Sequence, residues 1–317
     1  MKKFRLYVYL LPVILFVNGT FTGALERTIT NGHLTVSILL PDKDSGYYRG
    51  SRFDWSGIIA DLKWNGHTFF GQWFEKYNPT NHDAILGPVE AFDPIGFEAA
   101  KPGESFIKIG VGTVIKPNES LYDLRTPYRI SNYGKWNVHA GSQQVSFRHH
   151  LKDNDYAYDY KKTVKLSKNK PQLILSHSLK NTGKKRIETK VYNHNFFVID
   201  SQPTGPGFVV TFPFELEGTE QNDFVKFKGN ELIFLKELGR RNVSFKDLSN
   251  GKPSPYDLKI ENRRTKAGVR ITADRPVSKL VFWAAGKTLC PEPYIDIVID
   301  PGQEFSWNIT YDYYTAL

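Results

Sequence analysis

The chain has 317 residues, of which 40% are hydrophobic and 24% charged, a balance typical of a globular protein with a full core. The formal net charge of +9 accompanies no nucleic-acid-binding motif, so we expect no nucleic-acid partner. Cys290 is the only cysteine, which excludes an internal disulfide, and no Cys/His spacing typical of zinc occurs, so we expect a buried free thiol.

Residues 1–24 have the pattern of a signal peptide. Three basic residues stand among the first five positions, an apolar run follows, and small residues lead to Ala24. The apolar run is short and contains Pro12, which favours a cleaved signal over the alternative, an uncleaved anchor. Cleavage would remove three positive charges and lower the net charge from +9 to +6. We therefore expect an exported protein, periplasmic or secreted, without a stable membrane span.

Residues 25–317 are expected to form a single all-β domain, because alternation with a period of two dominates and no linker divides them. An Asn-Gly pair at Asn65 and Gly66, between two apolar runs, predicts a hairpin. One strand is expected over Ser105–Pro117, two over Tyr128–Leu151, and further strands continue to the C-terminus. The exceptions are one or two short helical turns, expected around Trp73–Tyr77 and Phe245–Leu248.

A long stretch between predicted strands, Phe74–Glu104, is rich in Pro, Gly, Asn and Asp and is expected to be a loop. Loops of this length in a compact domain are usually functional or mobile. The segment carries His82 and Glu90, and Arg52 lies upstream among aromatic residues. Aromatic faces and charged groups suit a sugar site, although the same composition suits salt-bridged surface loops equally well.

A histidine stands within a predicted strand, in the sequence VYNHNFFVID (Val191–Asp200). Side chains alternate across a strand, so Tyr192, His194, Phe196 and Val198 would share one face. An imidazole among aromatic rings suits proton transfer to a ring-shaped substrate, because its pKa lies near neutrality. A single histidine in a strand is more often a core residue bonded to the backbone, and the residues alone leave both interpretations open.

Near the C-terminus, Glu292 stands between Pro291 and Pro293. Proline fixes φ and removes a backbone donor, so this segment is expected to be a rigid irregular bend or a strand edge. A carboxylate held in this way is well positioned for chemistry. Taken alone, Glu292 is most simply a surface carboxylate.

Together, the two segments resemble those of the galactose mutarotase (aldose 1-epimerase) superfamily. His194, with Asn193 before it and Phe196 and Phe197 after it, resembles the N-H-x-Y/F-F segment that carries the family's catalytic histidine. Glu292 in LCPEP, followed by Pro-Gly and a final aromatic strand, resembles the closing segment that carries the catalytic glutamate.

The resemblance extends over about Gln172–Tyr313. Val198 stands where the family often has asparagine, and the family's N-terminal arginine segment and second histidine motif have no clean match. Candidates for substrate binding are therefore named by position and chemistry alone. They are Arg52, His82, Glu90 and Trp283.

The resemblance implies a β-supersandwich, a large twisted antiparallel sandwich, whose sugar site interconverts the anomers of an aldose. Glu292 would act as the base on the C1 hydroxyl and His194 as the acid on the ring oxygen. Only proton transfers are needed, so no metal or organic cofactor is implied. The alternatives are a non-catalytic carbohydrate-binding module, a polysaccharide-processing protein and a structural sandwich without a ligand. Glycoside hydrolysis would need a second carboxylate, for which Glu90 and Asp93 are candidates.

Overall fold

The structure, a computed structural model, describes residues 24–153, 155–216 and 222–316. The regular structure of these residues is antiparallel β-strand with one 3₁₀ turn, η1 (Ile199–Ser201), which confirms the all-β prediction. The described part of the chain contains no helix long and apolar enough to cross a membrane. All of the predicted signal peptide except Ala24 lies outside the described residues, so the signal peptide stays a prediction.

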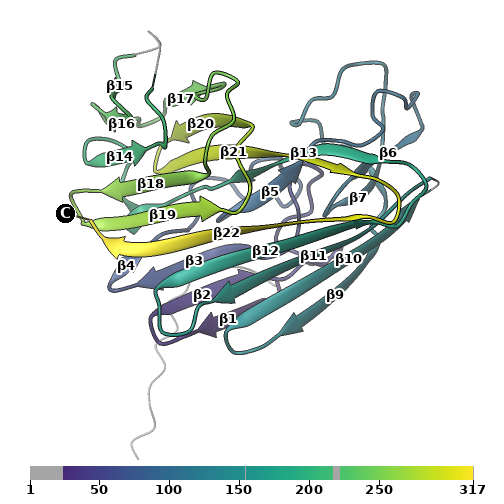
Figure 1. The fold of residues 1–317 in the computed structure, drawn as a ribbon, viewed down its shortest axis with the longest axis horizontal. Coiled ribbons are helices and arrows are strands. Elements are labelled where there is room, and N and C mark those ends of the chain that lie inside the picture. Colours follow the sequence, from purple (N-terminus) through teal and green to yellow (C-terminus); the bar gives the residue numbers. More distant parts are fainter. Residues whose placement is uncertain (1–23, 154, 217–221, 317) are drawn as a thin grey trace, which may run out of the picture.

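The largest sheet has ten antiparallel strands, and its long members run side by side across the lower part of Figure 1. In these strands buried and exposed positions alternate, which is the period of two that the sequence displays. From edge to edge they are β15 (Val225–Lys228), β16 (Glu231–Phe234), β14 (Phe208–Thr211), β18 (Asp257–Asn262), β19 (Ala267–Ala273), β22 (Glu304–Thr315), β12 (Gln172–Asn181), β11 (Tyr156–Leu166), β10 (Gln144–Asp153) and β9 (Lys135–Ala140).

A second, five-stranded sheet carries both residues predicted to be catalytic. Its order is β17 (Asn242–Phe245), β20 (Lys279–Ala285), β21 (Thr288–Ile299), β13 (Ile187–His194) and β5 (Val89–Phe92). Strand β5 lies in the middle of the segment expected to be a loop, so that expectation is wrong there. All four residues of β5 are buried, and the strand pairs with the end of β13, where Glu90 lies opposite Asn193.

Two smaller sheets complete the fold. The first contains β1 (Glu26–Thr30), β2 (Leu34–Leu39), β3 (Ile58–Trp64) and β4 (His67–Thr68), and the second contains β6 (Ser105–Lys108), β7 (Gly112–Ile115) and β8 (Ile130–Asn132). The predicted hairpin joins β3 to β4, where Asn65 and Gly66 have φ values of 47° and 84°. Positive φ at both positions is what a type I′ turn requires.

Several predicted boundaries are corrected. Ser105–Pro117 forms two strands instead of one, because the chain reverses at Gly110, whose φ is 74°. Tyr128–Leu151 contains β8, β9 and most of β10, three strands instead of two. The helical turns expected at Trp73–Tyr77 and Phe245–Leu248 are absent from these described segments. The first forms bends, and the second is the end of strand β17 followed by a bend and a turn. Short polar-aromatic stretches therefore gave a false helical signal.

Hydrophobic side chains gather in two main cores on opposite faces of β13. The larger core fills the space between the five-stranded and ten-stranded sheets and includes Val191 and Tyr311. The second core includes Phe53, Tyr192 and Phe196. Since both faces of β13 are covered, the side chains at its end lie inside the protein. The free thiol of Cys290 is buried in the second core, as predicted.

Candidate active site

His194 is the last residue of β13, and its ring lies on the side of the second core. The residues on either side of it face the ten-stranded sheet, as alternation predicted. The hydroxyl oxygen of Tyr311 lies 2.8 Å from Oδ1 of Asn193 and 2.8 Å from Oδ1 of Asn195, and its single proton is shared between these two acceptors. These bonds anchor the backbone on both sides of His194 and so fix the direction of its imidazole.

Glu292 lies in β21 between its two prolines. Of the two expected forms, the segment has that of a strand edge and not that of an irregular bend. The pairing of β21 with β13 stops short of this segment, so β21 has a strand neighbour here only on the β20 side. On the open side, the carbonyl of Pro291 accepts a hydrogen bond from Nδ2 of Asn195 at 2.7 Å. Pro291 and Pro293 have no backbone N–H group, but because no strand pairs with these positions of β21 on this side, no hydrogen bond between strands is lost. The rigid backbone of the two prolines holds Glu292 in place.

The two side chains meet directly. Nε2 of His194 lies 3.3 Å from Oε1 of Glu292, and their side chains are only 4% and 7% exposed. They border a small hollow of about 160 Å³, not a long open cleft. The other residues that line the hollow are Arg52, Asp83, Phe196, Ser244, Val281 and Trp283. The structure thus brings together four of the six predicted site residues.

Aromatic rings hold the imidazole from several sides. Phe196 stacks on His194 with ring centroids 3.8 Å apart and planes 5° apart, and Trp73 stacks on the far face of Phe196 at 5.3 Å. Phe53 meets the imidazole edge-on at 5.6 Å. Phe196 has a φ of 26°, a conformation that costs free energy for a residue with a side chain. This strained backbone turns the Phe196 ring back onto His194 after the strand has ended.

Arg52 forms the charged wall of the hollow. Its Nε and Nη2 donate to the hydroxyl of Tyr192 at 3.2 and 3.1 Å, and Nη1 donates to Asp83. Nε2 of His82 lies 2.9 Å from the other carboxylate oxygen of Asp83. His82 therefore does not line the hollow itself but supports Asp83, which does. The segment predicted to be a loop thus brings Asp83, held between Arg52 and His82, to the edge of the site.

Burial moves the two pKa values in opposite directions. Burial raises the pKa of Glu292 to about 7, against the charge of Arg52, which acts to lower it. Burial and then the charge of Arg52 lower the pKa of His194 well below its ordinary value. Each shift disfavours the charged form. A carboxylate with a raised pKa is a stronger base, and an imidazolium with a lowered pKa is a stronger acid.

Glu90 lies away from the hollow, in the core between the sheets. Its carboxylate pairs with Nζ of Lys162, lies 2.9 Å from Nε2 of His177 and accepts from Nδ2 of Asn193 at 3.1 Å. These contacts occupy both of its oxygens, so the structure gives Glu90 a structural setting and not a place beside a sugar. Among the described residues, no three His, Cys, Asp or Glu side chains are grouped to hold a metal ion.

Comparisons with known proteins agree with this architecture. No protein-family model matches the chain, and no curated protein matches its sequence. Solved structures do match: a protein of Escherichia coli K12 assigned provisionally as an aldose 1-epimerase has a TM-score of 0.57 and 13% identity over 92% of this chain and 100% of its own. The GalM/aldose epimerase homologue of C. elegans has a TM-score of 0.57 and 16% identity, covering 93% of this chain and 100% of its own.

A galactose mutarotase related enzyme from Lactobacillus acidophilus matches with a TM-score of 0.53 and 13% identity over 92% of this chain and 98% of its own. Together these similarities decide the architecture. The chain has the galactose mutarotase-like fold. The predicted resemblance is therefore confirmed at the level of the fold.

Within the galactose mutarotase-like fold, four of the residues that line the hollow were not among the predicted site residues. They are Asp83, Ser244, Val281 and Phe196, the last of which was named only as a neighbour of His194. Asp83 follows His82 directly, and the adjacency of an imidazole and a carboxylate was a usable signal. Ser244 and Val281 lie on the paired strands β17 and β20, and nothing in their local sequence distinguishes them from other strand residues.

Proposed function

We propose that this chain is an exported isomerase of the aldose 1-epimerase type, which interconverts the α and β anomers of a free sugar. The observation that carries the proposal is the direct contact of His194 and Glu292 at one recessed hollow. The two oxygens that exchange protons in this reaction are both bonded to C1 of the sugar. A contacting acid–base pair can therefore serve both oxygens at once.

In the proposed reaction, the proton that the resting pair holds on Glu292 first passes to Nε2 of His194, 3.3 Å away. Ionised Glu292 then takes the proton of the C1 hydroxyl while protonated His194 gives its proton to the ring oxygen. The bond from C1 to the ring oxygen breaks, its electron pair stays on the ring oxygen, and C1 becomes an aldehyde. After rotation about the C1–C2 bond, the two proton transfers reverse and the ring closes as the other anomer. The pair holds one proton in total and recovers its initial state in each cycle.

The surrounding residues have distinct proposed roles. Trp283 offers apolar surface to the sugar ring, and Arg52 with Asp83 offers polar groups to its hydroxyls. The small volume of the hollow favours a free monosaccharide over a polymer. For this reason we place the catalytic function ahead of polysaccharide processing and of binding without turnover.

The test is polarimetry on freshly dissolved α-glucose and α-galactose. His194→Ala and Glu292→Gln are each expected to lower the rate of anomer exchange by about 10²–10⁴-fold. His139→Ala and Glu188→Gln are matched controls, because both residues are exposed strand residues outside the hollow, and exchange should be unchanged. Wild-type protein that fails to accelerate exchange of any aldose would overturn the proposal, and sugar binding without exchange would favour the non-catalytic alternative.

A further inference from the structure

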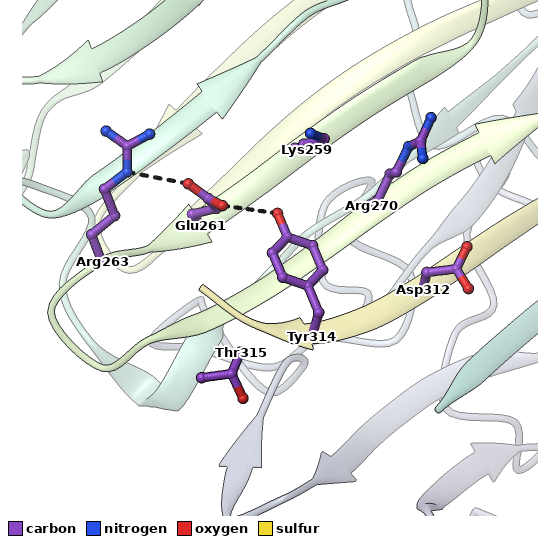
Figure 2. Close-up of a pocket in the computed structure, with 7 residues that line it drawn as sticks. All are labelled: Lys259, Glu261, Arg263, Arg270, Asp312, Tyr314 and Thr315. Atoms are coloured by element: carbon purple, nitrogen blue, oxygen red, sulfur yellow. Dashed lines mark hydrogen bonds and ion pairs between the residues drawn. The ribbon is translucent and has the colours of Figure 1, made fainter. Parts of the chain in front are cut away.

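A second cavity lies on the outer face of the ten-stranded sheet, remote from the candidate active site. It has a volume of about 770 Å³, well within the range of ligand-binding pockets. Strands β18, β19 and β22 form its floor, and Figure 2 shows its side chains standing over these strands. The lining residues are Lys259, Glu261, Arg263, Arg270, Asp312, Tyr314 and Thr315.

We call this cavity the groove. At its centre, a tyrosine ring lies over a glycine. Tyr314 of β22 is paired directly with Gly268 of β19. A Cβ atom on Gly268 would lie only 2.6 Å from Cε2 and 2.8 Å from Cζ of the Tyr314 ring. Figure 2 shows the ring with its broad face toward the viewer, who looks onto the strands. The absent side chain thus lets the ring lie close against the sheet with one face toward solvent.

Polar contacts fix the ring and its neighbours. The hydroxyl of Tyr314 donates to Oε1 of Glu261 at 3.0 Å, and Nε of Arg263 donates to Oε2 of the same carboxylate at 3.1 Å (Figure 2). Arg270 is held by two hydrogen bonds to Asp257, at 2.8 and 2.5 Å. An aromatic platform flanked by preorganised planar hydrogen-bonding groups loses little conformational entropy when a ligand binds.

The charges of the groove are nearly balanced. Three basic residues and two acidic residues line it, and both arginines are engaged by carboxylates. A nucleic acid also stacks on aromatic rings, but its binding depends on a surplus of positive charge that neutralises phosphates. Hydroxyl-rich rings need instead an apolar face and paired donors and acceptors. We propose that this groove binds a neutral glycan, with one sugar ring stacked on Tyr314 and its hydroxyls bonded to the flanking charged side chains.

This glycan site is separate from the candidate active site. Tyr311 and Tyr313 of β22 point into the large core, and Tyr311 reaches Asn193 of β13 there. Tyr314 points to the other side of β22, while His194 points to the other side of β13. Both sheets therefore lie between the groove and the hollow. The proposal does not rest on the catalytic function, and it gives the protein a means of attaching to a polymer while the hollow remains free.

The experiment is native electrophoresis of the full chain through gels that contain a neutral polysaccharide. Galactomannan, xyloglucan and pullulan are the probes, and a gel without polysaccharide gives the reference mobility. Wild-type protein should be retarded in at least one neutral gel. Tyr314→Leu should weaken the binding by about tenfold, while Tyr314→Phe, which keeps the ring, should retain most of it. Thermal melting of each variant establishes that it is folded.

Two further variants show whether the groove itself is responsible for the retardation. Tyr133→Leu removes an exposed tyrosine outside the groove and should leave the retardation unchanged. His194→Ala should also leave it unchanged, so failure of catalysis and failure of glycan binding are distinguishable. The proposal is overturned if no neutral gel retards the protein, if folded Tyr314→Leu is retarded like wild type, or if only polygalacturonate or a single-stranded oligonucleotide binds.

Discussion

The side chains of His194 and Glu292 are expected to hold one proton between them near neutral pH. As the pH rises through about 7, Glu292 ionises while His194 is already neutral, so the free pair loses its last proton. The proposed exchange needs this proton. We therefore expect kcat/KM from polarimetry to fall as the pH rises through about 7. On the acid side, we expect kcat/KM to fall only at a pH well below 6.5, the ordinary pKa of histidine. A profile that is flat from about pH 6 to 9, after subtraction of the uncatalysed rate, would contradict this assignment.

Glu292 also links protein stability to pH. Its pKa is raised from 4.5 to about 7, so the folded protein holds this proton more tightly than the unfolded chain does. The resulting stability is fully present below pH 4.5 and is lost as the pH rises through about 7. Glutamine has no charge to bury. Glu292→Gln should therefore exceed wild type in free energy of unfolding by about 1–3 kcal/mol at pH 8.

Near pH 4.5 the same substitution should have little effect, because the folded wild type is then protonated. Urea denaturation of both proteins at the two pH values measures the difference. An advantage of equal size at both pH values would show that glutamine improves packing or hydrogen bonding instead of removing a buried charge. The variant thereby separates the stability of the site from its proposed activity, which the substitution should abolish.

At the scale of elements, the segment just after β13 is held by the stacking of aromatic rings. Phe196 has a strained φ of 26°, and its ring stacks on that of His194. Phe196→Leu should lower kcat/KM for anomer exchange by about tenfold or more, since the imidazole loses the ring that fixes its orientation. Phe197→Leu is the matched control: its ring lies in the large core, so stability should fall while kcat/KM of the folded protein is retained. Equal kinetic losses would contradict the positioning role of Phe196.

The elements most visible in the sequence are those with one buried face. Alternation made β12 and β22 predictable, and the Asn65-Gly66 turn fixed one hairpin. Strand β5 has four buried residues and no alternation, so it could not be told from the surrounding loop. The β6–β7 turn is apolar and glycine-containing, which concealed the reversal at Gly110.

The candidate site was predictable only where a residue belonged to a recognisable segment. His194 and Glu292 stand in such segments, and the structure places them in contact. Glu90 was named for its charge in a long segment, but burial and pairing decide its position instead. Ser244 comes from a strand far away in the sequence, and only the pairing of β17 with β20 brings it to the hollow. No local sequence pattern therefore marks Ser244 as part of the candidate site.

At the scale of the whole molecule, a buried ionic cluster joins the two large sheets. Glu90 comes from β5 of the five-stranded sheet, while Lys162 and His177 come from β11 and β12 of the ten-stranded sheet. The side chains of all three are 0% exposed. The amide of Asn193, beside the proposed acid, also donates to Glu90 at 3.1 Å. The cluster therefore sets how the sheet that carries the candidate site lies against its neighbour.

Removing one charge from this cluster should be far more damaging than removing two. Glu90→Gln leaves the ammonium of Lys162 buried without its carboxylate, which should cost about 3–5 kcal/mol of folding free energy. In Glu90→Gln/Lys162→Met no ammonium remains in this cluster, so the double variant should be more stable than Glu90→Gln alone. Urea unfolding followed by tryptophan fluorescence suits the measurement, because Trp307 stacks on His177 at 4.5 Å within the cluster. Additive losses in the double variant would mean that the two residues act independently and would contradict the proposed coupling of their charges.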